Sequence, residues 1–334
     1  MPRVCKTGRG RCKWTTGATP PGGGVTLTPS GPIAATSNGQ VFQNLDITSS
    51  GAQAVYVNGF TDVQLKSCKI RHSAGYGVQL NGAHRFLGED LDIEYTGGPA
   101  SGANQDENRN NVQGDFSDDV RLNRIRMRKG SSGILLNYCL RPWCSFLEGY
   151  DFRGPFPRGQ LIQFGRCHNG LIEDFSSIST PSTSWDEDNV NMYLSSNVTI
   201  RRGLLDGNNS PAGWGIIFEQ HDEGATGGLV EDVDTIRMGN GGAAAYSVGF
   251  NITFRRTRHR ENICSDQGRG APLSGALMWG GGPGSTGLRI EDSRYYLPCN
   301  AGNIIWDSAS FDVIETTQGD YTQRPPIVLT MPWE

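Results

Sequence analysis

The sequence lacks the patterns that define several common protein classes. It has no run of about 18 apolar residues, so we expect no helix that crosses a membrane. The first residues are basic, but no apolar segment follows them, so we expect no secretory signal peptide. No long stretch repeats its apolar residues with helical periodicity. The histidines are scattered and no Cys-x-x-C pair occurs, so we expect no metal site and no cofactor.

Glycine, in contrast, is abundant, with 46 of 334 residues, roughly twice its average usage. Together with many Asn, Asp and Ser residues, this composition favours a chain that turns often. A chain of 334 residues is longer than one ordinary hydrophobic core supports, unless its units contact only their neighbours.

A repeat supplies such units. Apolar or small residues recur at offsets 0, 2, 8, 10, 13 and 15 from a starting residue. The clear copies start at Val55, Val78, Val112 and Val190, and weaker ones near Ile134, Ile162, Ile216, Tyr246, Leu277 and Ile305. Each pair of offsets places two side chains on one face of a short strand, which predicts three strands per repeat. Repeats of about 20 to 35 residues are typical of a solenoid, and a four-stranded propeller blade fits less well.

This pattern resembles the pectin-lyase-like β-helix superfamily over roughly residues 40–315. The resemblance implies an all-β fold, a right-handed parallel β-helix solenoid of about ten coils. We expect an extended basic arm and linker or cap at residues 1–40, the β-helix at 41–316, and an extended tail at 317–334. Pro325 and Pro326 exclude a helix from that tail, so it is expected to dock as an edge strand.

The arm concentrates positive charge. Residues 1–14 contain five Lys or Arg residues and no acid, whereas the whole chain carries −4. Such an arm is either a solvated tail or a segment that binds nucleic acid or an acidic protein face, and the body of the chain shows no nucleic-acid-binding motif.

The eight cysteines fall into three groups. Cys139 and Cys167 have equal offsets in consecutive repeats, which predicts stacking and a disulfide, and Cys264 and Cys299 are a weaker candidate pair. Cys68 and Cys144 occupy inward positions, where a buried thiol is expected. The arm contains Cys5 and Cys12, which either close a loop within the arm or form cross-links to another chain.

Candidate catalytic residues are few. The segment "FEQHDEG" contains Glu219, His221 and Asp222, a histidine beside carboxylates that could serve as a general base, but its place directly after a strand favours a solvated turn. The acidic segments that start at Asp106 and Asp186 precede strands three coils apart, about 14 Å, which is too far for a glycosidase pair. Outward positions at offset 1 are rich in amides, which we interpret as structural.

Two functions remain open. The preferred interpretation is a structural virion protein, because the sequence resembles the β-helix proteins that decorate the head, collar or tail of tailed bacteriophages, and because no convincing catalytic set is visible. Its partners would be other virion proteins or copies of itself, reached through the arm and tail, without membrane contact. The alternative is a polysaccharide lyase or depolymerase of the tail-spike type that acts on a bacterial surface glycan. The expected location is the virion, or otherwise the extracellular space.

Overall fold

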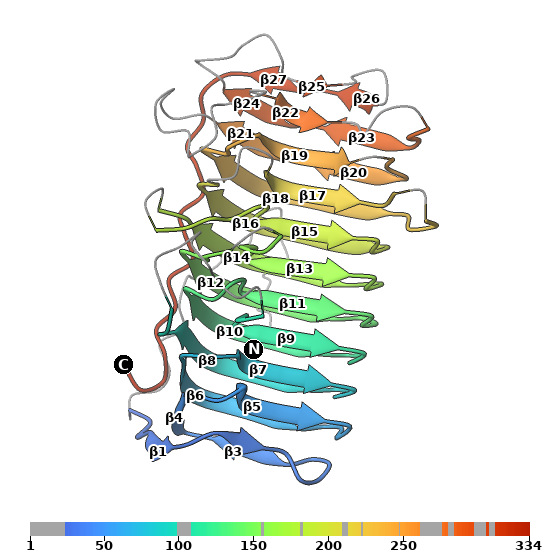
Figure 1. Ribbon diagram of the computed structural model, residues 1–334. Helices are drawn as coiled ribbons and strands as arrows, with labels where there is room; N and C mark the ends of the chain where they lie inside the picture. Colours follow the sequence, from blue (N-terminus) through green and yellow to red (C-terminus); the bar gives the residue numbers. More distant parts are fainter. Residues whose placement is uncertain are drawn as a thin grey trace, which may run out of the picture.

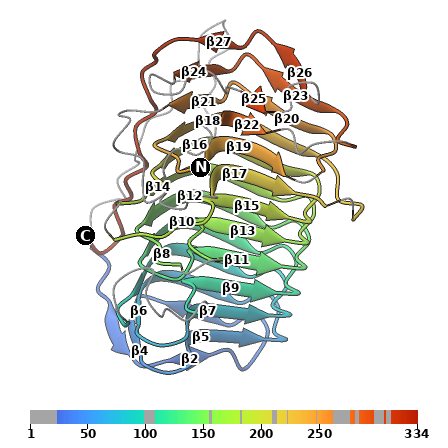
Figure 2. The ribbon, with the colours of Figure 1, turned by 45° about the horizontal axis from the view of Figure 1, so that its top comes forward.

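The fold is a parallel β-solenoid of about nine turns, seen from the side in Figure 1 and tilted in Figure 2. The computed structural model describes residues 24–98, 108–154, 157–180, 183–208, 213–221, 223–246, 248–260, 276–279, 284–296, 305–306 and 311–334. All regular elements in these ranges are strands, which confirms the all-β class expected from the repeat. The same ranges contain no helix with the length and apolar character needed to cross a membrane.

The larger sheet has 16 strands. Its main path is β1 (Thr28–Ser30), β4 (Leu45–Ser49), β6 (Gln64–His72), β8 (Leu87–Tyr95), β10 (Arg121–Arg128), β12 (Trp143–Tyr150), β14 (Leu171–Ile178), β16 (Val198–Asp206), β18 (Gly228–Ile236), β20 (Ile252–Arg255), β23 (Leu288–Glu291) and β26 (Phe311–Ile314). Beside it lie β3 (Val41–Gln43), β21 (Arg258–Arg260), β24 (Arg294–Tyr296) and β27 (Thr317–Gln318). Strands thus begin at Thr28, inside the segment that the sequence assigned to the arm and linker.

The smaller sheet has 11 strands. In order they are β2 (Ile33–Ala34), β5 (Gln53–Asn58), β7 (Tyr76–Asn81), β9 (Val112–Asp115), β11 (Ile134–Asn137), β13 (Ile162–Gly165), β15 (Val190–Tyr193), β17 (Trp214–Glu219), β19 (Gly241–Tyr246), β22 (Ala276–Trp279) and β25 (Ile305–Trp306). These strands stack in parallel, so their C-terminal ends lie along one edge of the solenoid (Figure 1).

The long strands of the larger sheet bend in the middle, and this bend explains why three predicted strands per repeat form two sheets. Ser67, Asp90 and Arg124 interrupt β6, β8 and β10 with left-handed φ values of 49°, 53° and 60°. One residue in this conformation turns the chain, so each long strand supplies two faces of the coil. Further along, Arg256 separates β20 from β21 at the same position.

The core fills the interior as the repeat predicted. Val55, Val78, Val112 and Val190 are at most 1% exposed and belong to one continuous cluster. Val55 pairs with Val78, and Val78 with Val112, on adjacent coils. Parallel stacking of identical template positions therefore confirms the predicted register.

The four described cysteines are free, buried thiols. This agrees with the prediction for Cys68 and Cys144, but not with the disulfide predicted between Cys139 and Cys167. Cys139 and Cys167 do lie on adjacent coils, but each thiol donates a hydrogen bond to a backbone carbonyl instead of forming a disulfide. The acceptor is Asn137 O for Cys139 and Leu136 O for Cys167, each at 3.3 Å. Cys5, Cys12, Cys264 and Cys299 lie outside the described residues.

The C-terminal tail, residues 320–334, runs back along the outer face of the larger sheet, from the last coils toward the first (Figure 1). Its backbone contacts in chain order are Arg324 N with Asp234 of β18, Ile327 N with Ser176 of β14, Leu329 N with Glu148 of β12, and Pro332 O with Val25 N. The tail makes no strand pairs of its own over this course, which differs from the predicted edge strand.

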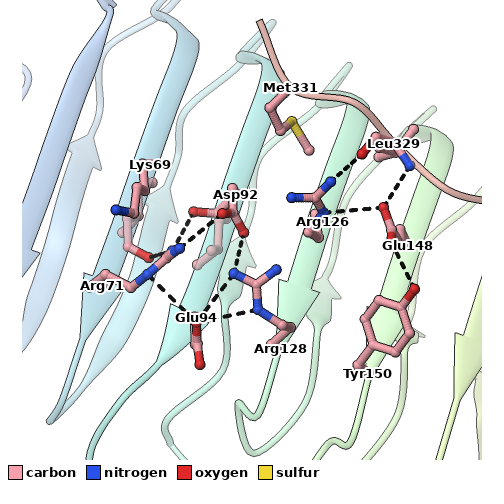
Figure 3. Close-up of polar contacts among 12 residues, drawn as sticks. Lys69, Arg71, Asp92, Glu94, Arg126, Arg128, Glu148, Tyr150, Leu329 and Met331 are labelled. Carbon is pink, nitrogen blue, oxygen red and sulfur yellow. Dashed lines mark hydrogen bonds and ion pairs between the residues drawn. The ribbon is translucent and has the colours of Figure 1, made fainter. Parts of the chain in front are cut away.

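Figure 3 shows where the tail crosses a polar array on β6, β8, β10 and β12. Arg126 contacts Glu334 at 2.6 Å and also reaches the carbonyl of Leu329, while Glu148 accepts from Leu329 N at 2.8 Å and from Tyr150 Oη at 2.8 Å. The side chains of Arg126 and Glu148 are only 13% and 4% exposed. The tail therefore provides hydrogen-bond and ion-pair partners for the largely buried side chains of Arg126 and Glu148.

Candidate active site

Two neighbouring strands of the smaller sheet bring polar side chains to its outer face. In β15, Val190 and Met192 are buried in the core, so Asn191 and Tyr193 face outward. In β17 the same alternation turns Glu219 outward, and Glu219 is the register partner of Tyr193. The strands are adjacent coils, so their outward residues lie side by side.

Three carboxyl groups meet at this point. Glu187 and Asp188 precede β15, and Glu219 ends β17. The amide nitrogen of Asn191 donates to Asp188 Oδ2 at 2.9 Å and to Glu219 Oε2 at 2.8 Å. Because the two N–H bonds of an amide diverge by about 120°, these two oxygens lie roughly 5 Å apart. Asp188 Oδ1 accepts a further bond from Trp214 N at 2.8 Å.

Burial holds protons on two of these acids. The pKa of Asp188 is raised well above its usual range by burial and then by the charges of Glu187 and Glu219. The pKa of Glu187 is raised to about 7 by burial and by Glu219, with Arg158 opposing the shift. Asp188 is only 3% exposed, whereas Glu187 is half-buried. Glu187 is thus the member of the cluster that can exchange a proton with a ligand near neutral pH.

His221 lies beside the cluster, as the sequence suggested. Its Nε2 is 3.9 Å from Glu219 Oε1, and its ring packs edge-on against Tyr193 and Tyr246. The neighbouring candidate Asp222 lies outside the described residues. The structure therefore places Glu219 and His221 side by side, as expected from their segment of the sequence. His221 is also part of a larger surface.

That surface is a row of five rings and one guanidinium group along the C-terminal edge of the smaller sheet. One member comes from each of six consecutive coils: Phe116, Tyr138, Arg166, Tyr193, His221 and Tyr246, here called the aromatic row. Phe116 and Tyr138 stack with centroids 4.9 Å apart, and the Arg166 guanidinium lies over Tyr138 at 5.6 Å and Tyr193 at 5.4 Å. Phe116, Tyr138 and Tyr246 are 58%, 48% and 36% exposed.

The arrangement provides acid–base groups beside a row of exposed side chains. A half-buried carboxylic acid with a raised pKa, next to a second carboxylate, is the chemistry of glycoside cleavage. Exposed rings in line are suited to the apolar faces of sugars. No group of three or more His, Cys, Asp or Glu placed as metal ligands occurs in the described ranges.

Sequence reasoning missed most of this site. Asp188 belongs to the acidic segment that was compared with the one starting at Asp106, three coils away, instead of with Glu219 on the next coil. The amide at offset 1, Asn191, was interpreted as structural, yet it joins the two carboxylates. The position directly after each short strand could have revealed the site, because large side chains occupy it in three consecutive coils, as Phe116, Tyr138 and Arg166.

The tryptophans play different roles from one another. Trp214 is buried on the outer face with Ile217 and Ala244, whereas Trp143 is 38% exposed on the larger sheet. Trp185 is half-buried, and the side chains of Trp279 and Trp306 lie outside the described residues. Trp143, Trp185 and Trp214 therefore lie outside the aromatic row.

No protein-family model and no curated protein sequence matches this chain. Among solved structures, the catalytic domain of a GH87 alpha-1,3-glucanase in complex with nigerose is similar, with a TM-score of 0.56 and 11% identity over 85% of this chain. An alginate lyase from Paenibacillus sp. has a TM-score of 0.49 and 9% identity over 87% of this chain and 99% of its own. The chain spans 56% of the glucanase domain's length. The comparison with the glucanase domain establishes that this chain has the parallel β-solenoid fold found in that enzyme.

Proposed function

We propose that this chain degrades a polysaccharide, as a glycoside hydrolase whose active site is the cluster of Glu187, Asp188 and Glu219. The observation that supports this most strongly is the meeting of these acids on adjacent coils, where Asn191 donates to both Asp188 and Glu219. The cluster lies beside the aromatic row, which would hold the polymer. The occurrence of the same fold in an alpha-1,3-glucanase is compatible with this activity.

In the proposed reaction, Glu187 donates its proton to the glycosidic oxygen as the bond from that oxygen to the anomeric carbon breaks. Glu219 lies on the same face of the solenoid as Glu187. Its negative charge stabilises the positive charge that develops on the sugar ring. Water then adds to the anomeric carbon, and its released proton returns the acid to its starting state. Asp188 and Asn191 hold Glu219 in position, which makes them positioning residues.

The test is product analysis on a panel of bacterial surface polysaccharides. Wild-type protein should release new reducing ends without unsaturated sugars, and Glu219→Gln should lose at least about a hundredfold in rate, the usual scale for removing an acid–base or charge-stabilising group. Asp312→Asn on the larger sheet, 65% exposed, is the matched control and should keep full activity. Unsaturated ends would identify a lyase instead, and absence of any product across the panel would refute the proposal.

The virion interpretation remains as a second candidate that rests on the sequence. Its cross-linking residues Cys5 and Cys12 lie outside the described residues, and the tail contacts its own coils, so the predicted contacts to a neighbouring chain stay predictions. A depolymerase of the tail-spike type would combine both functions. Non-reducing electrophoresis of native particles distinguishes them, because covalent adducts through the arm are expected only for a particle-bound chain.

A further inference from the structure

The aromatic row has a direction and a length, and both bear on the substrate. Its six members come from six consecutive coils, and strands of neighbouring coils are about 4.8 Å apart, so the row spans about 24 Å parallel to the solenoid axis. This is the length of a short oligosaccharide, which would lie along the axis against the exposed edges of successive members of the row.

The acid cluster divides the row unequally. Glu219 is the register partner of Tyr193 on one side and of Tyr246 on the other. Phe116, Tyr138 and Arg166 extend the row beyond Tyr193, whereas only Tyr246 continues it past Glu219 among the described residues. A bound polymer would therefore have more contacts on the side of the first coils than on the side of the last coils.

The charge of this face selects against acidic polymers. Of its carboxyl groups, Asp188 and Glu187 favour the protonated form and Glu223 is paired with Arg166, so Asp115 and Glu219 carry its uncompensated negative charge. The cation within the row, Arg166, is 3.7 Å from Glu223 and covers two tyrosine rings, so its charge is already compensated. Like charges within a Debye length of about 8 Å repel, so a carboxylate on every sugar would oppose binding.

Building on the proposed function, we infer that the substrate is an uncharged glycan, made of neutral hexoses or N-acetylhexosamines, that lies parallel to the solenoid axis on the aromatic row. Its longer segment occupies Phe116 to Tyr193, and the scissile bond lies at Glu219. Polyuronates such as alginate or polygalacturonate are excluded from the site by its carboxylates.

The experiment measures binding to full-length Glu187→Gln protein, which retains the row and the charge of Glu219 but lacks the proton donor and does not cleave. Probes are linear oligomers of glucose and of N-acetylglucosamine, and oligomers of galacturonate and of mannuronate. Replacing Tyr138 with Ala should weaken binding of uncharged oligomers of about six units by roughly fivefold, because one ring contact is lost, and should leave dimers unaffected. Phe146→Ala, which removes an exposed ring from the larger sheet, is the control and should change neither.

The outcomes separate the two proposals. Preferential binding of uncharged oligomers, with the length-dependent effect of Tyr138→Ala, supports the inference. If only the uronate oligomers bind, or if Tyr138→Ala and Phe146→Ala behave alike, the inference is wrong while a glycan-degrading function stands. If no oligomer binds and the wild type cleaves no glycan, the proposed function itself fails.

Discussion

Individual residues in each short strand alternate between two environments. Val190 and Met192 of β15 are buried in the core, whereas Asn191 and Tyr193 reach the outer face and contribute to the candidate site. A shift of one residue in register would exchange these roles, so core and site depend on the same alternation.

Val112 tests this alternation on the core side. It is fully buried between Val78 and Ile134 on the neighbouring coils. Val112→Asp would bury a carboxylate without a partner and should cost several kcal/mol, seen as a large fall in melting temperature. Gln79→Asp, on the half-buried outer face of β7, should cost far less. Equal melting temperatures for the two variants would contradict the observed register.

Two buried histidines predict acid sensitivity. Burial lowers the pKa of His72 to about 4 and that of His259 to about 3. In the unfolded chain these histidines have an ordinary pKa near 6.5, so they bind protons at pH values where the folded protein keeps them neutral. The free energy of unfolding should therefore fall as the pH drops below about 6.5 and continue to fall toward pH 4.

The comparison variant is His259→Gln. His259 contacts Thr235 Oγ1 at 2.7 Å and Thr257 Oγ1 at 3.1 Å, and Gln can keep one such bond. Its stability deficit, measured by urea unfolding, should be largest at pH 7 and shrink by a few kcal/mol, order of magnitude, toward pH 4.5. A deficit that is independent of pH would show that folding does not lower the pKa of His259.

Among the elements, the bent strands show what the sequence could not reveal. The template gave three strands per coil, but the residues at the bend are Ser67, Asp90, Arg124 and Phe146. None of them is glycine, the residue that usually marks a left-handed turn, and the Asp and Arg residues that recur at the later bends pair with each other only in the folded solenoid, as Arg202 does with Asp174. Strand positions were therefore predictable from apolar spacing, whereas the joining of two strands into one bent element was not.

The tail is the element whose removal should matter most. Deleting residues 321–334 removes the backbone donors that reach Asp234, Ser176 and Glu148, and the partner of Arg126. At about 1 kcal/mol for each lost hydrogen bond, the loss should total roughly 3–5 kcal/mol and should appear in denaturant unfolding. Glu334→Gln alone leaves Arg126 its contact with Glu148 at 3.2 Å and should cost about 1 kcal/mol. Unchanged unfolding of the truncated chain would show that the tail only rests on the sheet.

For the whole molecule, the candidate site depends on register between coils whose lengths differ. Asp188 and Glu219 are separated in the sequence by β15, β16 and the loops around them, and only their adjacency in the solenoid, through Asn191, makes them a pair. The sequence identified Glu219 and His221 from their local run, but it could not align Asp188 with them. In a solenoid, residues at equivalent positions of adjacent coils lie side by side. Loops of irregular length hide these equivalent positions in the sequence.

The central claim is that Glu187, Asp188 and Glu219 form the active site of a glycan-cleaving enzyme. Its most direct test is the pH dependence of kcat, measured by the release of reducing ends. Because Glu187 must hold a proton and its pKa is raised to about 7, activity should be high below that pH and fall as the pH rises through it. Glu187→Gln should lower kcat strongly and remove this limb of the profile. Wild-type rates in Glu187→Gln, or a profile that stays flat well above pH 7, would contradict the account.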